Sequence, residues 1–129
     1  MILVAAGFIY KNGKLLIAQR PEGKHGAFKW EFPGGKVEAD EDPRDCLVRE
    51  VREELAIEIE VQEAIETIFH RYPDRSVLLL FYTCRWVSGE PVAHGCAAFE
   101  WIDPKHLPHY DFLEADLELI QKIAQSGEH

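Results

Sequence analysis

The sequence predicts an α+β domain in which a mixed β-sheet lies between helices. Several short stretches rich in aliphatic and aromatic residues are bounded by turn residues, as strands usually are. Two stretches with a helical spacing of apolar residues interrupt them, one in the middle of the chain and one at its end. Strands interrupted by helices at separate places favour a mixed sheet with helical layers. With 129 residues, the chain is expected to be a single domain, residues 1–129, with its own core.

The first third of the chain is predicted to begin with a hairpin. Residues Ile2 to Tyr10 are rich in aliphatic side chains and are expected to form a central strand. Asn12-Gly13 is a strong signal for a two-residue turn, and Lys14 to Gln19 is the returning strand. Residues 20–29 contain Pro, Gly, Lys and His and are expected to form a loop. Trp30 to Phe32 is predicted to be a short extended segment, because proline follows it.

A helix is expected to begin near Pro43, because Asp42 is a good N-cap and proline suits the first helical position. At about 100° per residue, Glu50, Glu53 and Glu54 fall within one arc of this helix. Aliphatic residues fill the neighbouring arc and are expected to pack on the core. They are Leu47, Val48, Val51 and Leu55. Carboxylates so close together repel one another, so the pattern favours a site for a hard divalent cation. A solvated face neutralised by neighbouring arginines is the alternative.

The second half is predicted to contain three more strands and a final helix. Ile57 to His70 alternates roughly, as one long strand or two broken ones, and Tyr72 to Arg75 is a turn. Val77 to Val87 is a long apolar run and is predicted to be a buried strand, whereas Ala97 to Ile102 is the last strand. A short helical turn starts at Asp103-Pro104. The C-terminal helix is expected from about Leu113, with apolar residues at Leu117, Ile120, Ile123 and Ala124.

Composition excludes several classes of protein. The formal net charge of −9 argues against binding to nucleic acid backbones. The apolar N-terminal stretch is too short to span a membrane and lacks a basic leader, so a cytoplasmic protein is expected. Cys46, Cys84 and Cys96 are spaced like neither a zinc site nor a disulfide set and are expected to be buried or half-buried thiols in a reducing compartment.

The central helix and its flanks resemble a known family signature. Gly35, Glu41, Arg49-Glu50-Val51, Glu53-Glu54 and Ile57 follow the spacing of the Nudix box, which is typical of hydrolases that act on nucleoside diphosphates linked to another moiety. The resemblance implies the Nudix fold. One position departs from the pattern, because the family usually has glycine where this chain has Ala56. That glycine ends the helix, often with a positive φ, which alanine tolerates less well.

The resemblance also implies a metal site and its chemistry. It implies Mg²⁺, for which Mn²⁺ can substitute, bound by the carbonyl of Gly34 and by Glu50, Glu53 and Glu54. Glu41 is expected to support this site, and Arg49 to orient a glutamate of the box through its i, i+4 relation to Glu53. Glu53 is the favoured catalytic base, with Glu50 as the alternative.

Residues Trp30 to Glu38 resemble the MutT branch of the family, which includes 8-oxo-dGTP diphosphatases and the related CTP pyrophosphohydrolase. The resemblance places Arg20 and His25 near the phosphates and sugar, Phe32 in the base pocket, and Arg75 within reach of the substrate. Asp116 stands where MutT-type enzymes have an asparagine that reads the base. An ionised aspartate only accepts hydrogen bonds, whereas a protonated one in an apolar pocket also donates.

We therefore expect a Mg²⁺-dependent nucleoside triphosphate diphosphatase that acts on damaged or non-standard (d)NTPs, as a monomer or homodimer with no protein partner. The alternatives are hydrolysis of ADP-ribose or a dinucleoside polyphosphate, and a non-catalytic nucleotide-binding module. A second departure is His94-Gly95, in the loop where many relatives carry a glutamate that approaches the metals. His94 is expected to be a solvated residue, with substitution for that glutamate as the alternative.

Overall fold

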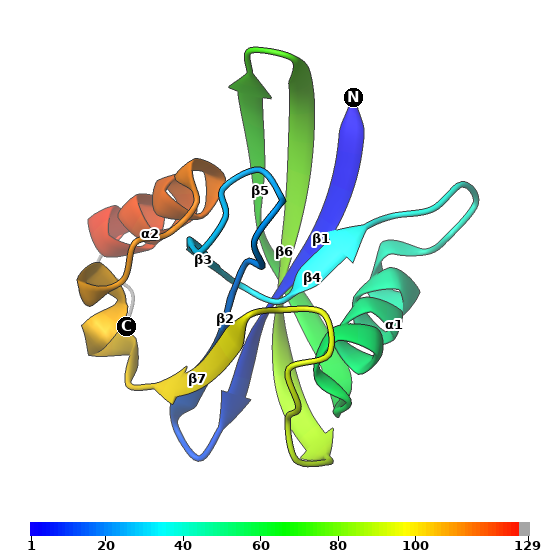
Figure 1. Cartoon of the computed structure of the whole chain (residues 1–129), viewed down its shortest axis with the longest axis vertical. Helices are drawn as coiled ribbons and strands as arrows, with labels where there is room; N and C mark the ends of the chain where they lie inside the picture. Colours follow the sequence, from blue (N-terminus) through cyan, green and yellow to red (C-terminus); the bar gives the residue numbers. More distant parts are fainter. Residues whose placement is uncertain (127–129) are drawn as a thin grey trace.

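A mixed β-sheet lies between two helices that cover its opposite faces (Figure 1). The computed structural model describes the backbone of residues 1–126 and the side chains of residues 1–122. The main path of the sheet runs β3-β2-β1-β6-β5, and this arrangement confirms the predicted α+β class. The strands are β1 (Ile2–Lys11), β2 (Lys14–Gln19), β3 (Trp30–Glu31), β4 (Gly34–Lys36), β5 (Glu58–Tyr72), β6 (Arg75–Ser88) and β7 (Ala98–Ile102). The helices are α1 (Pro43–Leu55), the short 3-10 helix η1 (Pro104–His109) and α2 (Glu114–Ser126).

The β1–β2 hairpin is paired only next to its turn, at Tyr10 with Leu15 and at Lys11 with Lys14. Farther from the turn, β4 pairs antiparallel with β1, so that Gly34 lies opposite Ala6. On its other edge β1 runs parallel to β6. The strand β2 pairs with both β3 and β7. The divergence of β1 from β2 therefore brings the two glycines of β4 against the centre of the sheet.

Each face of the sheet has its own hydrophobic core. On one face, α1 buries Cys46, Leu47, Val51 and Leu55 against β1, β5 and β6, as the apolar arc predicted, with Val48 partly buried beside them. On the other face, Ala115 and Leu119 of α2 pack on aromatic residues that include Phe32 and Phe112. Leu117 is exposed, because the buried face of α2 is centred on Ala115, Asp116 and Leu119 instead. Ile123 and Ala124 belong to α2, but their side chains lie outside the described residues.

Most elements begin and end close to the predicted positions. Helix α1 begins at Pro43, and the carboxylate of Asp42 accepts a hydrogen bond from the backbone N–H of Arg44 at 2.8 Å. The segment from Glu58 is one long strand, with register shifts against β6 that mark bulges. The short strand β4 was not predicted, since three residues rich in glycine carry little strand signal. No helix of the described part of the chain is long and apolar enough to cross a membrane.

Ala56 ends α1 in the left-handed conformation, with φ 60° and ψ 31°. Its N–H donates to the carbonyl of Arg52, so the residue takes the capping geometry that glycine usually takes at the end of a helix. An L-residue with a Cβ is strained in this conformation by about 1–2 kcal/mol. Alanine at position 56 therefore preserves the conformation that ends the helix, but it lowers the stability of the protein.

Replacing Ala56 by glycine is expected to stabilise the protein by about 0.5–1 kcal/mol, since glycine removes the strain but adds chain entropy to the unfolded state. The melting temperature should rise by about 2–4 °C. Ala64→Gly in β5 is the matched control, because Ala64 is exposed and does not have a positive φ, and this change should destabilise the protein. A lower melting temperature for the Ala56 variant would contradict the strain argument.

Candidate active site

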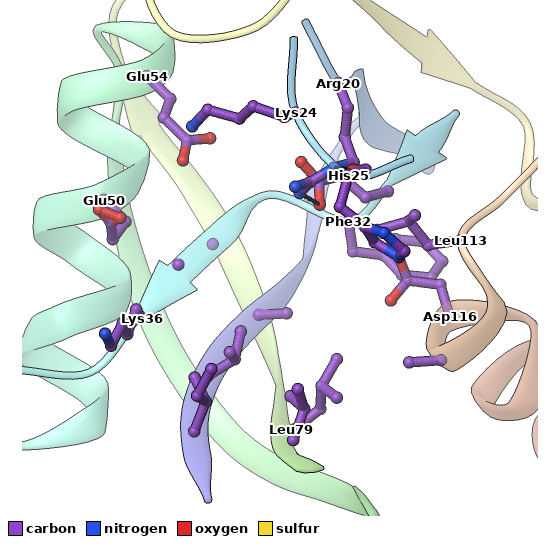
Figure 2. A pocket seen from close by; sticks show the side chains of 18 of the residues that line it. Arg20, Lys24, His25, Phe32, Lys36, Glu50, Glu54, Leu79, Leu113 and Asp116 are labelled. Atoms are coloured by element: carbon purple, nitrogen blue, oxygen red, sulfur yellow. Dashed lines mark hydrogen bonds and ion pairs between the residues drawn. The ribbon is translucent and has the colours of Figure 1, made fainter. Parts of the chain in front are cut away.

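A pocket of about 410 Å³ lies between α1, the end of β2 and the start of α2. Figure 2 shows Glu50 and Glu54 on one side of it and Phe32 and Asp116 on the other. The floor is formed by β1 and β4, whose residues Ala6, Gly34 and Gly35 line the pocket. One end of the pocket is thus rich in carboxylates from a helix, and the other is apolar with one buried acid.

The glycines of β4 allow close contacts with two neighbouring elements, β1 at Gly34 and α1 at Gly35. A Cβ on Gly34 would collide with the carbonyl of Ala5, and one on Gly35 would collide with the carboxylate of Glu50. The backbone at Gly35 is therefore in direct contact with the Glu50 side chain. This contact holds the Glu50 carboxylate at the floor of the pocket, beside the backbone of Gly34 and Gly35.

The carboxylates at this end are partly shielded from water and repel one another. Burial, with the charges of Glu31 and Glu50, raises the pKa of Glu54 to about 8. The pKa of Glu50 is also raised, first by burial and then by the charge of Glu53. Burial raises the pKa of Glu31 as well, although the guanidinium of Arg20 opposes the shift. The ionised forms of these carboxylates are therefore disfavoured in the metal-free pocket.

Arg49 lies outside the pocket and contacts three glutamates of the Nudix box, Glu41, Glu50 and Glu53. Its Nε and Nη2 donate to the two carboxylate oxygens of Glu41 at 2.9 and 3.0 Å. Its Nη1 lies 3.3 Å from Glu50 Oε1 and 3.2 Å from Glu53 Oε1. The hydrogen bonds from Arg49 lower the pKa of Glu41 to about 2. Arg49 and Glu41 therefore form an ion pair beside the carboxylates of Glu50 and Glu53.

The predicted convergence of three glutamates is only partly present. Glu50 and Glu54 line the pocket, whereas the Glu53 side chain is 58% exposed, bonds to Arg49 and lies outside it. Within the described residues, no group of three His, Cys, Asp or Glu side chains is arranged to hold a metal ion. The Glu53 carboxylate would have to turn toward the pocket to reach an ion bound at Glu50 and Glu54.

The residues present nevertheless fit a hard divalent cation. Glu50 and Glu54 supply carboxylate oxygens, and the backbone of Gly34 and Gly35 lines the same part of the pocket. Such oxygens are the ligands that Mg²⁺ prefers, and the ion keeps several waters, so that few protein ligands suffice. A bound cation would also relieve the repulsion that raises the pKa of Glu54.

The stability of the metal-free protein is expected to fall as pH rises. The pKa of Glu54 is about 8 in the folded protein, against an ordinary value of 4.5. Between these pH values the folded state binds one proton more than the unfolded state, so the free energy of unfolding decreases as pH rises, by at most about 1.4 kcal/mol per pH unit, and levels off above pH 8. Thermal melts in a chelator between pH 5 and pH 9 measure this slope. Glu54→Gln should make it shallower, and an unchanged slope would contradict the assignment.

The apolar end of the pocket is built around Asp116, which is almost fully buried at 3% exposure. Burial, with the charge of Glu31, raises its pKa well above the ordinary value, against a hydrogen bond to the backbone of Phe32. Phe32 lines the same part of the pocket and stacks on Phe112, with ring centroids 5.2 Å apart. Phe32 is therefore both a core residue and a wall of the pocket.

The three predicted basic residues all line the pocket. Arg20 is held away from the carboxylates of α1, because its Nη1 lies 2.9 Å from Glu31 and its Nε donates to the carbonyl of His25 at 2.7 Å. The His25 ring contacts Tyr72 edge to face, and the Arg75 guanidinium lies 5.6 Å from the centre of the same ring. In this structure Arg20 thus orients Glu31, and His25 and Arg75 flank Tyr72.

Sequence reasoning missed Glu31 and Lys24 as residues of the site. Glu31 stands between two aromatic residues that precede the paired glycines, and a charged residue in an apolar segment is a usable signal for a buried acid. Lys24 points toward Glu54 across the pocket (Figure 2). It lies in a loop with Gly23 and Gly26 on either side, and no spacing pattern singles it out. The positive charge of its amine opposes the rise in the pKa of Glu54.

The loop that carries Gly95 lies over α1. The N–H groups of His94 and Gly95 both donate to the carbonyl of Glu54, at 3.0 and 3.1 Å. Gly95 lines the pocket, whereas His94 is exposed and is not among the lining residues. His94 is therefore a solvated loop residue, as expected.

The three cysteines are unpaired thiols, as expected. Cys46 and Cys84 are buried and Cys96 is half-buried.

Comparisons with known proteins agree with this geometry. A model of the NUDIX domain matches residues 4–122. The chain is 40% identical over 121 residues to a CTP pyrophosphohydrolase of Escherichia coli, covering 94% of this chain and 90% of that protein. It is 34% identical to an 8-oxo-dGTP diphosphatase of the same organism, covering 93% and 94% of the two chains. The solution structure of the E. coli ORF135 protein superposes with a TM-score of 0.83 at 37% identity, covering 99% of this chain and 91% of that one.

Proposed function

The chain belongs to the Nudix hydrolase family, and we propose that it is a nucleoside triphosphate diphosphatase of the MutT type. Such an enzyme hydrolyses a (d)NTP to the monophosphate and pyrophosphate. The observation that carries the proposal is the pocket with two unlike ends, one with Glu50 and Glu54 and one with the buried Asp116. A nucleotide has the same two unlike ends, a charged phosphate chain and a flat base.

We assign the acidic end to the metal and the phosphates. Nudix hydrolases generally use divalent ions, and Mg²⁺ is the ion we propose, held by the carbonyl of Gly34 with Glu50, Glu53 and Glu54. When bound, such ions neutralise phosphate charge and lower the pKa of a water molecule. Glu53 and Glu50 are the candidates for the general base, and the exposed position of Glu53 leaves it accessible to water. We propose that Lys24, Arg75 and His25, which line the same pocket, contact the phosphates and sugar.

We assign the apolar end to the base. A protonated Asp116 carries one donor and one acceptor, as the asparagine of related enzymes does, so that it can pair with a base edge that offers both. Phe32 forms the wall beside it, and Glu31, held by Arg20, borders the same space. The relatives named for CTP and for 8-oxo-dGTP favour a cytosine or an oxidised guanine nucleotide over an unmodified dGTP or dATP.

A substrate panel tests this function. Pyrophosphate release is measured with Mg²⁺ for 8-oxo-dGTP, dGTP, CTP, dCTP and 5-substituted dCTP, beside a Glu53→Gln variant. We expect turnover of at least one of them, and a large loss in the variant. Turnover that the substitution leaves unchanged would remove Glu53 from the site. No turnover of any nucleotide by the wild-type protein would favour a binding module.

A further inference from the structure

His70 of β5 lies between two carboxylates of α2. Its Nδ1 is 2.9 Å from Glu118 Oε1, and its Nε2 is 3.2 Å from Glu114 Oε2. The imidazole is only 16% exposed, whereas the two glutamates are more open to solvent, at 42% for Glu118 and 68% for Glu114. One partly buried ring thus bridges two positions that are one helical turn apart. The ring therefore contacts the first turns of α2 at two points.

The His70 contacts and the buried side chain of Asp116 lie on opposite sides of α2. At about 100° per residue, Glu114 and Glu118 lie within roughly 40° of each other around the helix axis, and Asp116 lies roughly 180° from their midpoint. Asp116 is buried in the pocket, while the two glutamates reach out to His70. Because side chains extend about 5–6 Å from the axis, a rotation of 10° moves Asp116 by roughly 1 Å. A rotation of α2 about its axis would therefore change the position of Asp116 and the His70 contacts together.

A second ion pair joins the same two elements but lies farther along the helix. Lys122 Nζ is 3.5 Å from Glu66 Oε1, and the Lys122 side chain is 55% exposed. This pair lies more than one turn beyond Asp116, toward the C-terminal end of α2. It serves as an internal control, since its loss removes a β5–α2 ion pair and leaves the His70 contacts with Glu114 and Glu118 in place.

His70 also touches a wall of the pocket. Its ring packs edge to face on Tyr72, with centroids 4.5 Å apart, and Tyr72 lines the pocket and contacts His25. The imidazole is thus packed from β5 on one side and bonded to α2 on the other. A side chain of similar size that kept only one hydrogen bond would fill this space without holding both glutamates.

We propose that His70 is a positioning residue for base recognition, which sets the rotation of α2 and through it the place of Asp116. This inference rests on the assignment of Asp116 to the base in the proposed function. It goes beyond that assignment, because His70 does not line the pocket and touches neither substrate nor metal. Its effect should therefore appear in nucleotide binding and leave the chemical step unchanged.

The test is binding of nucleoside monophosphates, dCMP and dGMP, measured by calorimetry in a chelator. His70→Gln and Glu118→Gln should each weaken binding of the preferred monophosphate by about fivefold to tenfold, which lies within the range of a typical lost hydrogen bond. Lys122→Gln should leave it within twofold. The double variant of His70 and Glu118 should bind no more weakly than the weaker single variant, because both changes break the same contact. In hydrolysis of the preferred triphosphate, KM should rise and kcat should stay within twofold.

The outcomes separate this inference from the proposed function. Equal weakening by Lys122→Gln and His70→Gln would overturn it, since helix docking alone would then explain the effect. Additive effects in the double variant, or a loss in kcat with unchanged KM, would overturn it as well. Wild-type protein that binds neither monophosphate would also refute it. Absence of triphosphate hydrolysis alone would count against the proposed function and leave the binding result to decide on His70. Glu118 is on the surface, so its variant serves if the His70 variant fails to fold.

Discussion

Replacing Glu54 by glutamine is expected to lower kcat by a factor of about 10³ or more, and to raise the melting temperature of the metal-free protein at pH 8. Both effects follow from the loss of the negative charge of the Glu54 carboxylate. Glu54 lies in the pocket close to Glu31 and Glu50, and burial and their charges raise its pKa to about 8. An amide of the same shape removes that repulsion, and it also removes a charged oxygen ligand. Opposite signs for activity and stability are typical of a residue kept for function.

Two other glutamates separate the causes. Glu53 is exposed and paired with Arg49, so Glu53→Gln should lower activity without stabilising the metal-free protein. Glu60 pairs with Arg85 on the surface, with both side chains 56% exposed, and Glu60→Gln should change neither quantity measurably. Steady-state pyrophosphate release and thermal melts in a chelator give both readouts. A Glu54 variant that keeps kcat within tenfold would exclude the residue from the metal site.

The sequence predicted the framework of this site well, because its signals are local. The Asp42 cap, the Pro43 start and the apolar arc of α1 depend on neighbours within a few residues, and each is found as expected. The turn between β5 and β6 follows from Pro73-Asp74 in the same way. Spacing along a helix also placed Glu50 and Glu54 on one side, where both face the pocket.

What the sequence did not predict depends on contacts between distant segments. Strand β4 exists because Gly34 and Gly35 fit against β1, which no local propensity indicates. The three glutamates share an arc of α1, yet only Glu50 and Glu54 line the pocket, whereas Glu53 is exposed and bonded to Arg49. Glu31 of β3 lines the pocket and pairs with Arg20, which follows β2 in the chain. Such partners are fixed by the fold, and helical periodicity carries no information about them.

The second large effect concerns Asp116 and the choice of base. Asp116→Ala is expected to lower kcat/KM for the preferred nucleotide by about 10²–10³, since the base would lose both hydrogen bonds and a buried polar edge would be left unpaired. Asp116→Asn is the informative comparison. If Asp116 is protonated in its buried site, asparagine presents the same kinds of donor and acceptor, and kcat/KM should stay within about tenfold.

An ionised Asp116 leads to the opposite expectation. A carboxylate only accepts hydrogen bonds, so asparagine would add a donor and shift preference among the nucleotides of the panel.

A protonated Asp116 also predicts a pH dependence of kcat/KM. Burial raises the pKa of Asp116, and as pH rises through that pKa the carboxyl would ionise and kcat/KM would fall. The asparagine variant has no such ionisation and should lose that part of the profile. Comparing kcat/KM from pH 6 to pH 10 for the two proteins therefore decides which form reads the base, and matching profiles would show that Asp116 does not titrate in the catalytic range.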